Sequence, residues 1–344
     1  MKKVLLLTTG GTIASRTSDG GLIPALASEE LLRYMSDLGQ YYQIEGRDLF
    51  NLDSSNIQAE EWQMIAREVY AALDDYDGIV ITHGTDTMAY TASMLGYMLQ
   101  NLKKPVVITG SQVPIDNLLT DARNNLYIAF AAVDSGIPGV TIAFNRKIIC
   151  GCRAVKVRTM GFEAFESVNA PCWGEIYSNG MRCNRDYIVE PDYHAPTVLK
   201  DNVCKDVFLL KLIPGTNPEV FDMLSALHYR GIVIETFGLG GLHFVRRNLL
   251  PKLRMLTESG VSVVACSQCL YETSDFSVYE VGRKLLDCGI IQGRDMTTEA
   301  AVTKLMWALG QTDDPKEVQR MFATGYAGEI DMGAPTGFNS CDRC

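Results

Sequence analysis

The feature that most constrains this chain is a series of short apolar segments that do not alternate with polar residues. In the first half they span residues 3–9, 78–82, 105–109 and 139–144. Residues 60–73, the residues from Asp86 onward and residues 121–133 separate them and are typical of helices. Strands that alternate with helices form parallel sheets, and continuous apolar strands indicate that both sheet faces are covered. The sequence therefore predicts an α/β fold.

The strand and helix pattern is interrupted once. Residues 185–205 contain Pro191, Pro196 and several charged residues, so they are expected to lie outside regular structure. Strand patterns then resume at 207–212, 231–236 and 261–266, and helical patterns at 218–227, 247–259, 279–288 and 297–309. We predict a larger N-terminal parallel-sheet domain (1–188) with most catalytic residues, a linker (189–206) and a smaller C-terminal α/β domain (207–344).

The charge and hydropathy of the chain exclude several classes of partner. Its 344 residues carry a net charge of −10, which disfavours binding to nucleic acid or to anionic membranes. No segment approaches the roughly 18 apolar residues of a membrane-spanning helix. The apolar run Val4–Leu7 is too short for a secretory leader. We expect no nucleic-acid partner, no membrane association and a cytoplasmic location.

Ten cysteines include two pairs with zinc-like C-x-x-C spacing, Cys266/Cys269 and Cys341/Cys344. The first pair follows a predicted buried strand, and the second ends the sequence. With no export signal, the thiols are expected to be reduced, and free cysteines are often simply buried. The interpretation we favour is a core thiol plus a frayed chain terminus, with no metal site.

Ligands of open α/β sheets bind at the carboxyl ends of the strands, so the residues that follow each strand carry the functional signal. The first strand runs into Thr8-Thr9-Gly10-Gly11-Thr12. Paired glycines allow a sharp turn and let N–H groups approach a developing negative charge. The spacings of the phosphate-binding glycine loops are absent. Alone, this segment fits a reactive loop and a plain turn equally well.

Other strand ends are also polar. Residues 78–82 are followed by His83-Gly84-Thr85-Asp86, although Thr85 or Asp86 could serve only to cap the next helix. Asp53-Ser54-Ser55 and Gly110-Ser111-Gln112 supply further hydroxyl, carboxylate and amide groups. Together, these segments predict one cluster of polar groups at a single edge of the sheet.

These segments resemble one family. The motifs are TTGGTIAS at 8–15, DSSN at 53–56, HGTDTMAYTAS at 83–93, TGSQVP at 109–114, RAVK at 153–156, DMTTEA at 295–300 and TKL at 303–305. They resemble the bacterial-type L-asparaginases, and the cytoplasmic type I branch more than the periplasmic one. The resemblance covers nearly the whole chain. It implies two α/β domains joined by a linker, and hydrolysis of L-asparagine to L-aspartate and ammonia, sometimes with glutaminase activity. It also implies no metal or organic cofactor, and a homodimer, often doubled to a homotetramer, with active sites near the subunit contact.

The resemblance also implies residue roles. Thr12 matches the usual candidate nucleophile, and Thr85, Asp86 and Lys156 match a second threonine activated through a lysine and an aspartate. The residues that match substrate-binding positions are Gly11, Asp53, Ser54, Ser55, Thr85, Asp86 and Ser111. Ser54 and Ser55 would grip the α-carboxylate, Asp86 the α-ammonium group, and the Ser111 backbone the side-chain amide.

Elementary chemistry supports these roles. A threonine hydroxyl is a weak nucleophile that needs a base. Lys156 can act as that base only when neutral, which burial favours. The alternative is a structural lysine paired with Asp86, since ion-pair networks are common. The N–H groups of Gly11–Thr12 and of the Thr85 region are the expected donors to the tetrahedral oxyanion.

Three positions depart from the family pattern. Leu22 stands where many relatives carry a tyrosine in a mobile loop over the site. Gly238-Leu239-Gly240-Gly241 lacks the asparagine that often follows G-V-G, and Glu235 replaces an arginine that some type I relatives associate with an effector site. The lid tyrosine, the contacts from this second-domain loop and allosteric control are therefore not inherited from the resemblance.

Two other functions remain as alternatives. The amide-hydrolysing subunit of archaeal-type tRNA-dependent amidotransferases shares the threonine motifs but carries an extra N-terminal domain, for which a motif at residue 8 is expected to leave no room. A non-catalytic asparagine-binding regulator would need neither both hydroxyls nor the lysine. The preference between asparagine and glutamine stays open because one methylene changes binding by only about 1–3 kcal/mol. The order in which the two threonines attack also stays open.

Overall fold

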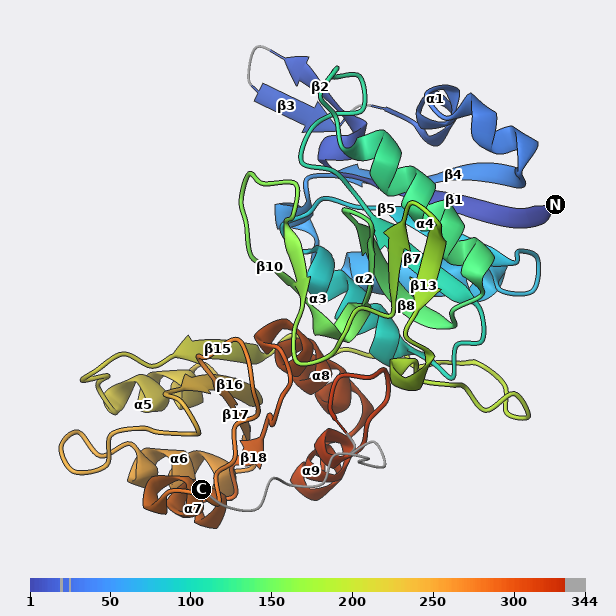
Figure 1. Ribbon diagram of the computed structural model, residues 1–344. Helices are drawn as coiled ribbons and strands as arrows, with labels where there is room; N and C mark the ends of the chain where they lie inside the picture. The colour runs from blue at the N-terminus through green and yellow to red at the C-terminus, as the bar shows by residue number, and fades with distance from the viewer. Residues whose placement is uncertain (19–20, 25, 332–344) are drawn as a thin grey trace, which may run out of the picture.

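The computed structural model describes residues 1–18, 21–24 and 26–331, with the side chains of residues 17–25 left out of the description. Its larger sheet has eight strands in the order β13-β12-β9-β8-β7-β5-β1-β4. The strands are β1 (Lys2–Gly10), β4 (Tyr42–Leu52), β5 (Gly78–Thr82), β7 (Pro105–Thr109), β8 (Gly139–Phe144), β9 (Lys147–Cys150), β12 (Gly174–Tyr177) and β13 (Gly180–Cys183). All lie in the upper part of Figure 1.

This sheet is mixed. The run β4-β1-β5-β7-β8 is parallel, whereas β9, β12 and β13 pair antiparallel along one edge. The predicted α/β fold is confirmed, but a purely parallel N-terminal sheet is wrong for these three strands. The physical reason begins at Asn145 and Arg146, which join β8 to β9 with φ of 44° and 66°. Two consecutive residues with positive φ make the tight hairpin turn that reverses the chain.

Helices cover both faces of the parallel strands. On one face, Leu5, Leu7 and Ile81 pack with α2 (Ala59–Ala72) and α3 (Met88–Met98). On the other face, the alternate residues of the same strands pack with α1 (Ser28–Arg33) and α4 (Ala122–Ser135). Because successive side chains of a strand point to opposite faces, each apolar strand contributes to both layers of the core.

The second sheet is smaller and fully parallel, in the order β15-β16-β17-β18. Its strands are β15 (Val207–Lys211), β16 (Gly231–Thr236), β17 (Ser262–Ser267) and β18 (Ile291–Gln292). Right-handed crossovers that all step in one direction put their helices on one face. These helices are α5 (Glu219–Ala226), α6 (Leu250–Glu258) and α7 (Glu280–Asp287), which share a core cluster with Ile232 and Ile234. Val233 and Val264 face α8 (Thr298–Gln311) instead.

Helix α8 joins the two sheets. It packs against α3, which covers the first sheet (Figure 1). In this contact the Tyr97 and Trp307 rings stack with their centroids 5.9 Å apart. At the same junction, Arg153 Nη1 lies 2.8 Å from Asp295 Oδ2, and both side chains are buried. One hydrophobic cluster therefore runs through both parts of the chain. The predicted boundaries at 189–206 stay a prediction.

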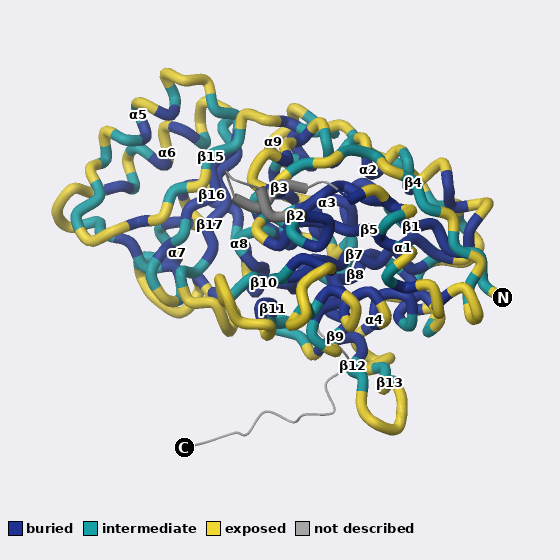
Figure 2. The backbone as a smooth tube through the Cα atoms, turned by 90° about the horizontal axis from the view of Figure 1, so that it is seen from above, coloured by how far each residue is buried: buried dark blue, intermediate teal, exposed yellow. Residues whose placement is uncertain are grey.

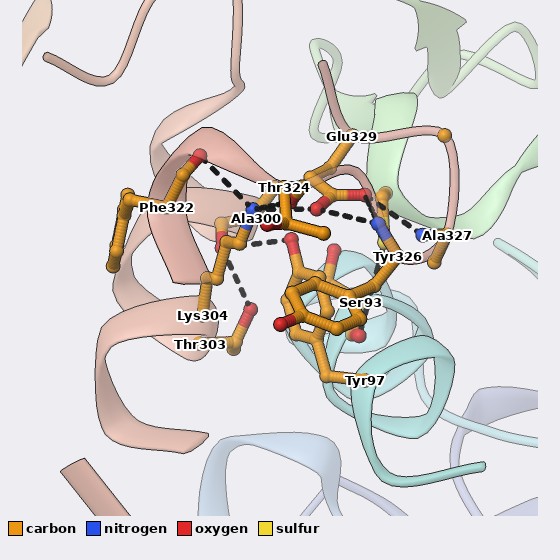
Figure 3. A network of polar contacts seen from close by, with 12 residues as sticks. Ser93, Tyr97, Ala300, Thr303, Lys304, Phe322, Thr324, Tyr326, Ala327 and Glu329 are labelled. Carbon is orange, nitrogen blue, oxygen red and sulfur yellow. Dashed lines mark hydrogen bonds and ion pairs between the residues drawn. The ribbon is translucent and has the colours of Figure 1, made fainter. Parts of the chain in front are cut away.

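A buried ion pair fastens the segment after α9 (Pro315–Ala323) to this junction. Lys304 of α8 lies with its Nζ 2.6 Å from Glu329 Oε1, and both side chains are fully buried (Figure 3). Lys304 also donates to the carbonyl oxygen of Thr324, while Glu329 accepts from the N–H groups of Tyr326 and Ala327. Every charge in the pair is thus met by hydrogen bonds, as burial requires.

The remaining strands form three small sheets. They are β2 (Ser15–Ser18) with β3 (Gly21–Pro24), β10 (Ala154–Lys156) with β11 (Phe165–Ser167), and β6 (Leu99–Gln100) with β14 (Val198–Leu199). In Figure 2 the central strands are mostly buried, and exposed residues lie on loops and outer helix surfaces. None of the helices in the described part of the chain is long and apolar enough to span a bilayer.

The eight cysteines within the described residues are free thiols. Cys266 is buried in β17, as expected of a core thiol, and Cys269 is exposed. Cys341 and Cys344 lie outside the described residues. Over 1–18, 21–24 and 26–331, no group of three or more His, Cys, Asp or Glu side chains is arranged to hold a metal ion.

Candidate active site

The parallel strands place the candidate site at a reversal of strand order. The chain leaves β1 for β4 on one side and then continues to β5, β7 and β8 on the other. Ligands of such sheets bind beyond the carboxyl ends of the strands where the order reverses. Thr8 of β1 pairs with Thr82 of β5, so the segments with Thr12 and Thr85 leave the sheet side by side.

Close backbone contacts hold these segments together. A Cβ atom on Gly11, where φ is 81°, would lie 2.4 Å from the Gly84 nitrogen. A Cβ atom on Gly84 would lie 2.6 Å from Ser54 Oγ. Real Cβ atoms do not come this close, so only glycine fits at either position. The predicted convergence of the loops after β1, β4 and β5 is therefore observed.

The second threonine lies in a hydrogen-bonded group with the lysine and the aspartate. Lys156 Nζ is 2.8 Å from Thr85 Oγ1 and 2.6 Å from Asp86 Oδ1. Thr85 is 6% exposed and the Lys156 side chain 16%, whereas the Asp86 side chain is 66% exposed. The amine therefore lies between a covered hydroxyl and a carboxylate open to solvent.

The helix-cap interpretation of Thr85 and Asp86 is wrong. Helix α3 begins at Met88, its N-cap residue is Thr87, and no side chain caps it. Thr87 Oγ1 donates to the Ser54 carbonyl oxygen at 2.8 Å instead. Thr85 and Asp86 thus lie before the helix, and their side chains are free for the contacts with Lys156.

Gln112 ties the lysine segment to Thr85. Its Oε1 accepts from Thr85 Oγ1 at 3.3 Å, and its Nε2 donates to the carbonyl oxygens of Thr159 and Gly161. Those two carbonyls belong to the loop between β10 and β11, and Lys156 ends β10. Gln112 therefore holds this loop against the strand-end segments.

Thr12 begins a short 3-10 helix, Thr12–Ala14, and is partly exposed. Among the described residues, its hydroxyl has no hydrogen-bond partner, in contrast with that of Thr85. It follows Gly11 as Thr85 follows Gly84, so the two threonines flank the contact between these glycines. The hydroxyl is thus available to a substrate.

The predicted substrate-binding residues differ in exposure and in the hydrogen bonds that their side chains already make. Ser54 is buried beside Gly84, while Asp53 and Ser55 are exposed. Asp53 Oδ1 accepts from both the N–H and the hydroxyl of Ser55, and these bonds lower the pKa of Asp53. Ser111 is fully buried, and its hydroxyl donates to the Val113 carbonyl oxygen. The side chain of Ser111 is therefore engaged in its own turn.

Sequence reasoning missed two residues that hold this edge. Asp121, the N-cap of α4, accepts from the N–H groups of Gln112 and Val113, and Asn125 donates to the Gly110 carbonyl oxygen. Burial raises the pKa of Asp121. An aspartate before a helix signals a cap, but nothing in the sequence shows that it reaches back to residues 112 and 113.

The three positions that depart from the family pattern make different contacts in the structure. The backbone of Leu22 pairs with Thr17 in the hairpin after Thr12, and its side chain lies outside the described residues. Glu235 accepts from Thr298 Oγ1 at 2.7 Å and pairs with Lys211. In the loop after β16, the Phe237 N–H bonds the Gly241 carbonyl oxygen, which closes a tight turn.

Comparison with known proteins identifies the family of the chain. Residues 3–189 match the family model "Asparaginase, N-terminal", and residues 206–322 match "Glutaminase/Asparaginase C-terminal domain". An L-asparaginase of Thermococcus kodakarensis is 41% identical over 95% of this chain and 99% of its own length. The structure of the thermostable L-asparaginase from that organism superposes with a TM-score of 0.90 at 40% identity, covering 96% of this chain and all of the other.

Two further relatives concern the type I branch of the family and the amidotransferase alternative. L-asparaginase I from Vibrio cholerae superposes with a TM-score of 0.84 at 32% identity, over 96% of this chain and 99% of that one. A glutamyl-tRNA(Gln) amidotransferase component of Pyrococcus abyssi is 37% identical over 96% of this chain and 77% of its own length.

The two-sheet fold and the hydroxyl-rich strand ends define an α/β amidohydrolase. Within that class, the chain belongs to the asparaginase family, and its structural neighbours include type I enzymes. The predicted family and fold are thereby confirmed.

Proposed function

We propose that this chain hydrolyses L-asparagine to L-aspartate and ammonia, with minor activity on L-glutamine. One observation carries the proposal. A covered threonine hydroxyl, that of Thr85, lies 2.8 Å from the Lys156 amine, which also contacts Asp86. A hydroxyl, an amine that can serve as its base and a carboxylate beside that amine lie within hydrogen-bond reach, which is the arrangement that can take up the proton of an attacking hydroxyl.

In the proposed mechanism, Thr12 Oγ1 attacks the side-chain amide carbon, and its proton passes toward the Thr85–Lys156 pair. The tetrahedral oxyanion accepts hydrogen bonds from the N–H groups of Thr12 and Thr85. Collapse of this intermediate breaks the C–N bond, and the nitrogen leaves with that proton as ammonia. Water, activated by the same pair, then hydrolyses the ester on Thr12 and restores the hydroxyl. No step needs a metal or an organic cofactor.

The same residues orient the substrate. Asp86 is exposed and negative, which suits the α-ammonium group, although Lys156 competes for it in the free protein. The turn formed by Asp53, Ser54 and Ser55 borders Gly84 and offers hydroxyls to the α-carboxylate. The backbone around Gly11 and Ser111 is proposed to contact the side-chain amide.

The test is release of ammonia from asparagine and glutamine over a concentration series of each. We expect Thr12→Ala and Thr85→Ala each to reduce turnover of asparagine at least 10³-fold, with circular dichroism and thermal unfolding unchanged. Ser178→Ala, in the turn between β12 and β13, is the matched control and should keep full activity. Wild-type turnover by either threonine variant refutes the mechanism.

The amidotransferase alternative rests on the similarity to the Pyrococcus abyssi protein. It predicts that amide hydrolysis depends on a partner protein and on charged tRNA. A purified chain that releases ammonia at full rate without either excludes it. Saturable asparagine binding with no ammonia release would instead support a regulator.

We also infer that the protein acts in the cytoplasm as a homodimer or homotetramer. The N-terminal apolar run is part of β1, which pairs with β4 and β5 inside the large sheet, so this run is a strand of the folded protein. Sedimentation in solution tests the oligomeric state, and cell fractionation tests the location.

A further inference from the structure

His83 follows β5 directly and is completely buried one residue before Gly84. Its Nδ1 lies 2.6 Å from the Gly84 carbonyl oxygen, and its Nε2 lies 2.9 Å from Thr91 Oγ1. Trp62 Nε1 in turn lies 2.9 Å from the same hydroxyl. A chain of hydrogen bonds therefore runs from α2 through α3 to the peptide that precedes Thr85.

The chemistry of these groups fixes the role of each one. A carbonyl oxygen only accepts, so Nδ1 carries the proton of the ring. An indole N–H only donates, so the Thr91 hydroxyl accepts from Trp62, and since it has no other acceptor among the described residues, it gives its own hydrogen to Nε2. The imidazole is therefore neutral and protonated on Nδ1. Burial agrees, since it lowers the pKa of His83 to about 4.

This bond controls the direction of a second group. The Gly84 carbonyl and the Thr85 N–H belong to one planar trans peptide and point in opposite directions. Because the ring holds the carbonyl toward the core, the Thr85 N–H points away from the core. Within the described residues this N–H has no hydrogen-bond acceptor, although the Thr85 hydroxyl contacts Lys156. Gly84 lacks a Cβ, so it has no side chain of its own to restrain this peptide.

We propose that His83 is a positioning residue whose Nδ1–H fixes the Gly84–Thr85 peptide, so that the Thr85 N–H stabilises the tetrahedral oxyanion. The inference rests on the proposed amide hydrolysis and adds a residue that does not touch the substrate. Loss of this constraint would weaken binding of the transition state while leaving binding of the ground-state amide nearly unchanged.

Two substitutions separate the two ring nitrogens. The amide nitrogen of an asparagine side chain reaches the place of Nδ1, so His83→Asn keeps a donor to the Gly84 carbonyl. Glutamine reaches the place of Nε2 instead, so His83→Gln keeps the Thr91 contact and loses that donor. We expect His83→Asn to keep kcat within a few-fold, and His83→Gln to lower kcat roughly 10- to 100-fold with KM within about twofold.

Thr91→Val controls for lost core packing, because it removes the Nε2 contact and leaves the Nδ1–H bond. It should lower thermal stability and change kcat only a few-fold. Equal kcat values for His83→Asn and His83→Gln would overturn the proposal. So would an increase in KM for His83→Gln with kcat unchanged. If His83→Gln does not fold, as judged by circular dichroism, the His83→Asn variant and the ring resonances described next still decide.

A readout independent of turnover is the ¹⁵N spectrum of histidine-labelled protein. The chain has four histidines, so the His83 signals can be assigned from their absence in His83→Asn. We expect a protonated Nδ1 and an unprotonated Nε2 from pH 8 to pH 5. The opposite tautomer, or titration near pH 6.5, refutes the proposal whatever the activity. The expected tautomer in a wild-type protein that releases no ammonia refutes the proposed hydrolysis, and with it the oxyanion role, while the peptide orientation stands.

Discussion

Lys156 makes two contacts whose surroundings differ. The contact with Asp86 faces water, and exposed ion pairs contribute little to stability. The contact with Thr85 is covered, so its geometry is held without competition from solvent. The proposed role of this lysine as a base for the hydroxyl belongs to the covered contact, and a structural role belongs to the exposed one.

Substitution of this lysine separates the two roles. Lys156→Met removes the amine at similar volume, and we expect kcat for asparagine to fall about 10²- to 10⁴-fold. Lys156→Arg keeps the positive charge beside Asp86 but cannot become neutral, so it should be as inactive. Steady-state kinetics measure both. Recovery of activity by the arginine variant would favour the structural role.

The buried His83 also predicts how stability depends on pH. Its pKa is about 4 when folded and near 6.5 when unfolded, so between these values the unfolded chain binds more protons. Its contribution to stability is complete above pH 6.5 and is lost as pH falls toward 4, at up to about 1.4 kcal/mol per pH unit. Urea unfolding of wild type and His83→Asn from pH 7 to 4.5 should show wild type losing stability faster. Parallel curves would contradict this.

Among the elements, the predicted strands are those whose apolar sequence pattern agrees with their buried position in a sheet. The strands β5, β7, β8 and β16 have the predicted bounds. Each is a short, mainly apolar run whose end is marked by a change in residue type. β9, β12 and β13 were not predicted. They are short strands of four residues each toward one end of the sheet, where β13 is the outermost strand, and their pairing depends on turns such as Asn145-Arg146 that the strand pattern does not predict. Helix α9 was also missed because only three of its residues are buried.

The candidate site also contains residues whose positions could be predicted from the sequence and residues whose positions could not. Residues that adjoin strand ends, such as Thr12 and Thr85, could be predicted because topology brings strand ends together. The positions of Gln112 and Asp121 depend on contacts with loops elsewhere in the chain, which no local pattern encodes. The buried pair of Lys304 and Glu329 is of the same kind, since α9 lies between them.

That pair supports a prediction about α8 and the segment after α9. Lys304→Met leaves the Glu329 carboxylate buried without its cation, and we expect a loss of about 3–5 kcal/mol in the free energy of unfolding. Adding Glu329→Gln should restore part of the loss. Lys205→Met, in an exposed pair with Glu60, is the control and should leave the urea midpoint unchanged. Equal midpoints for Lys304→Met and wild type would contradict the assignment.

At the scale of the whole molecule, the two sheets are joined by buried contacts rather than by the connecting segment alone. Arg153 pairs with Asp295, and it also donates to the carbonyl oxygens of Asp295 and Gly328. Asp295 in turn accepts from the Asp331 N–H. These bonds join the end of the first α/β unit, the start of α8 and the segment after α9.

Removal of the guanidinium should loosen this junction. For Arg153→Met we expect a loss of about 3–5 kcal/mol and faster amide hydrogen exchange in β10 and residues 293–298, because Asp295 stays buried and unpaired. Arg230→Met, which removes an exposed pair with Asp313, should leave exchange in both segments unchanged. Identical exchange in the two variants would show that the junction does not depend on Arg153.

The position of Arg153 in the sequence has a mechanical consequence. Lys156 follows it after about 10 Å of extended chain, and the strand between them belongs to neither large sheet. A tilt of the smaller sheet would therefore pull on Arg153 and shift the amine relative to Thr85. The distance between that amine and the Thr85 hydroxyl depends on how the smaller sheet is seated against the larger one.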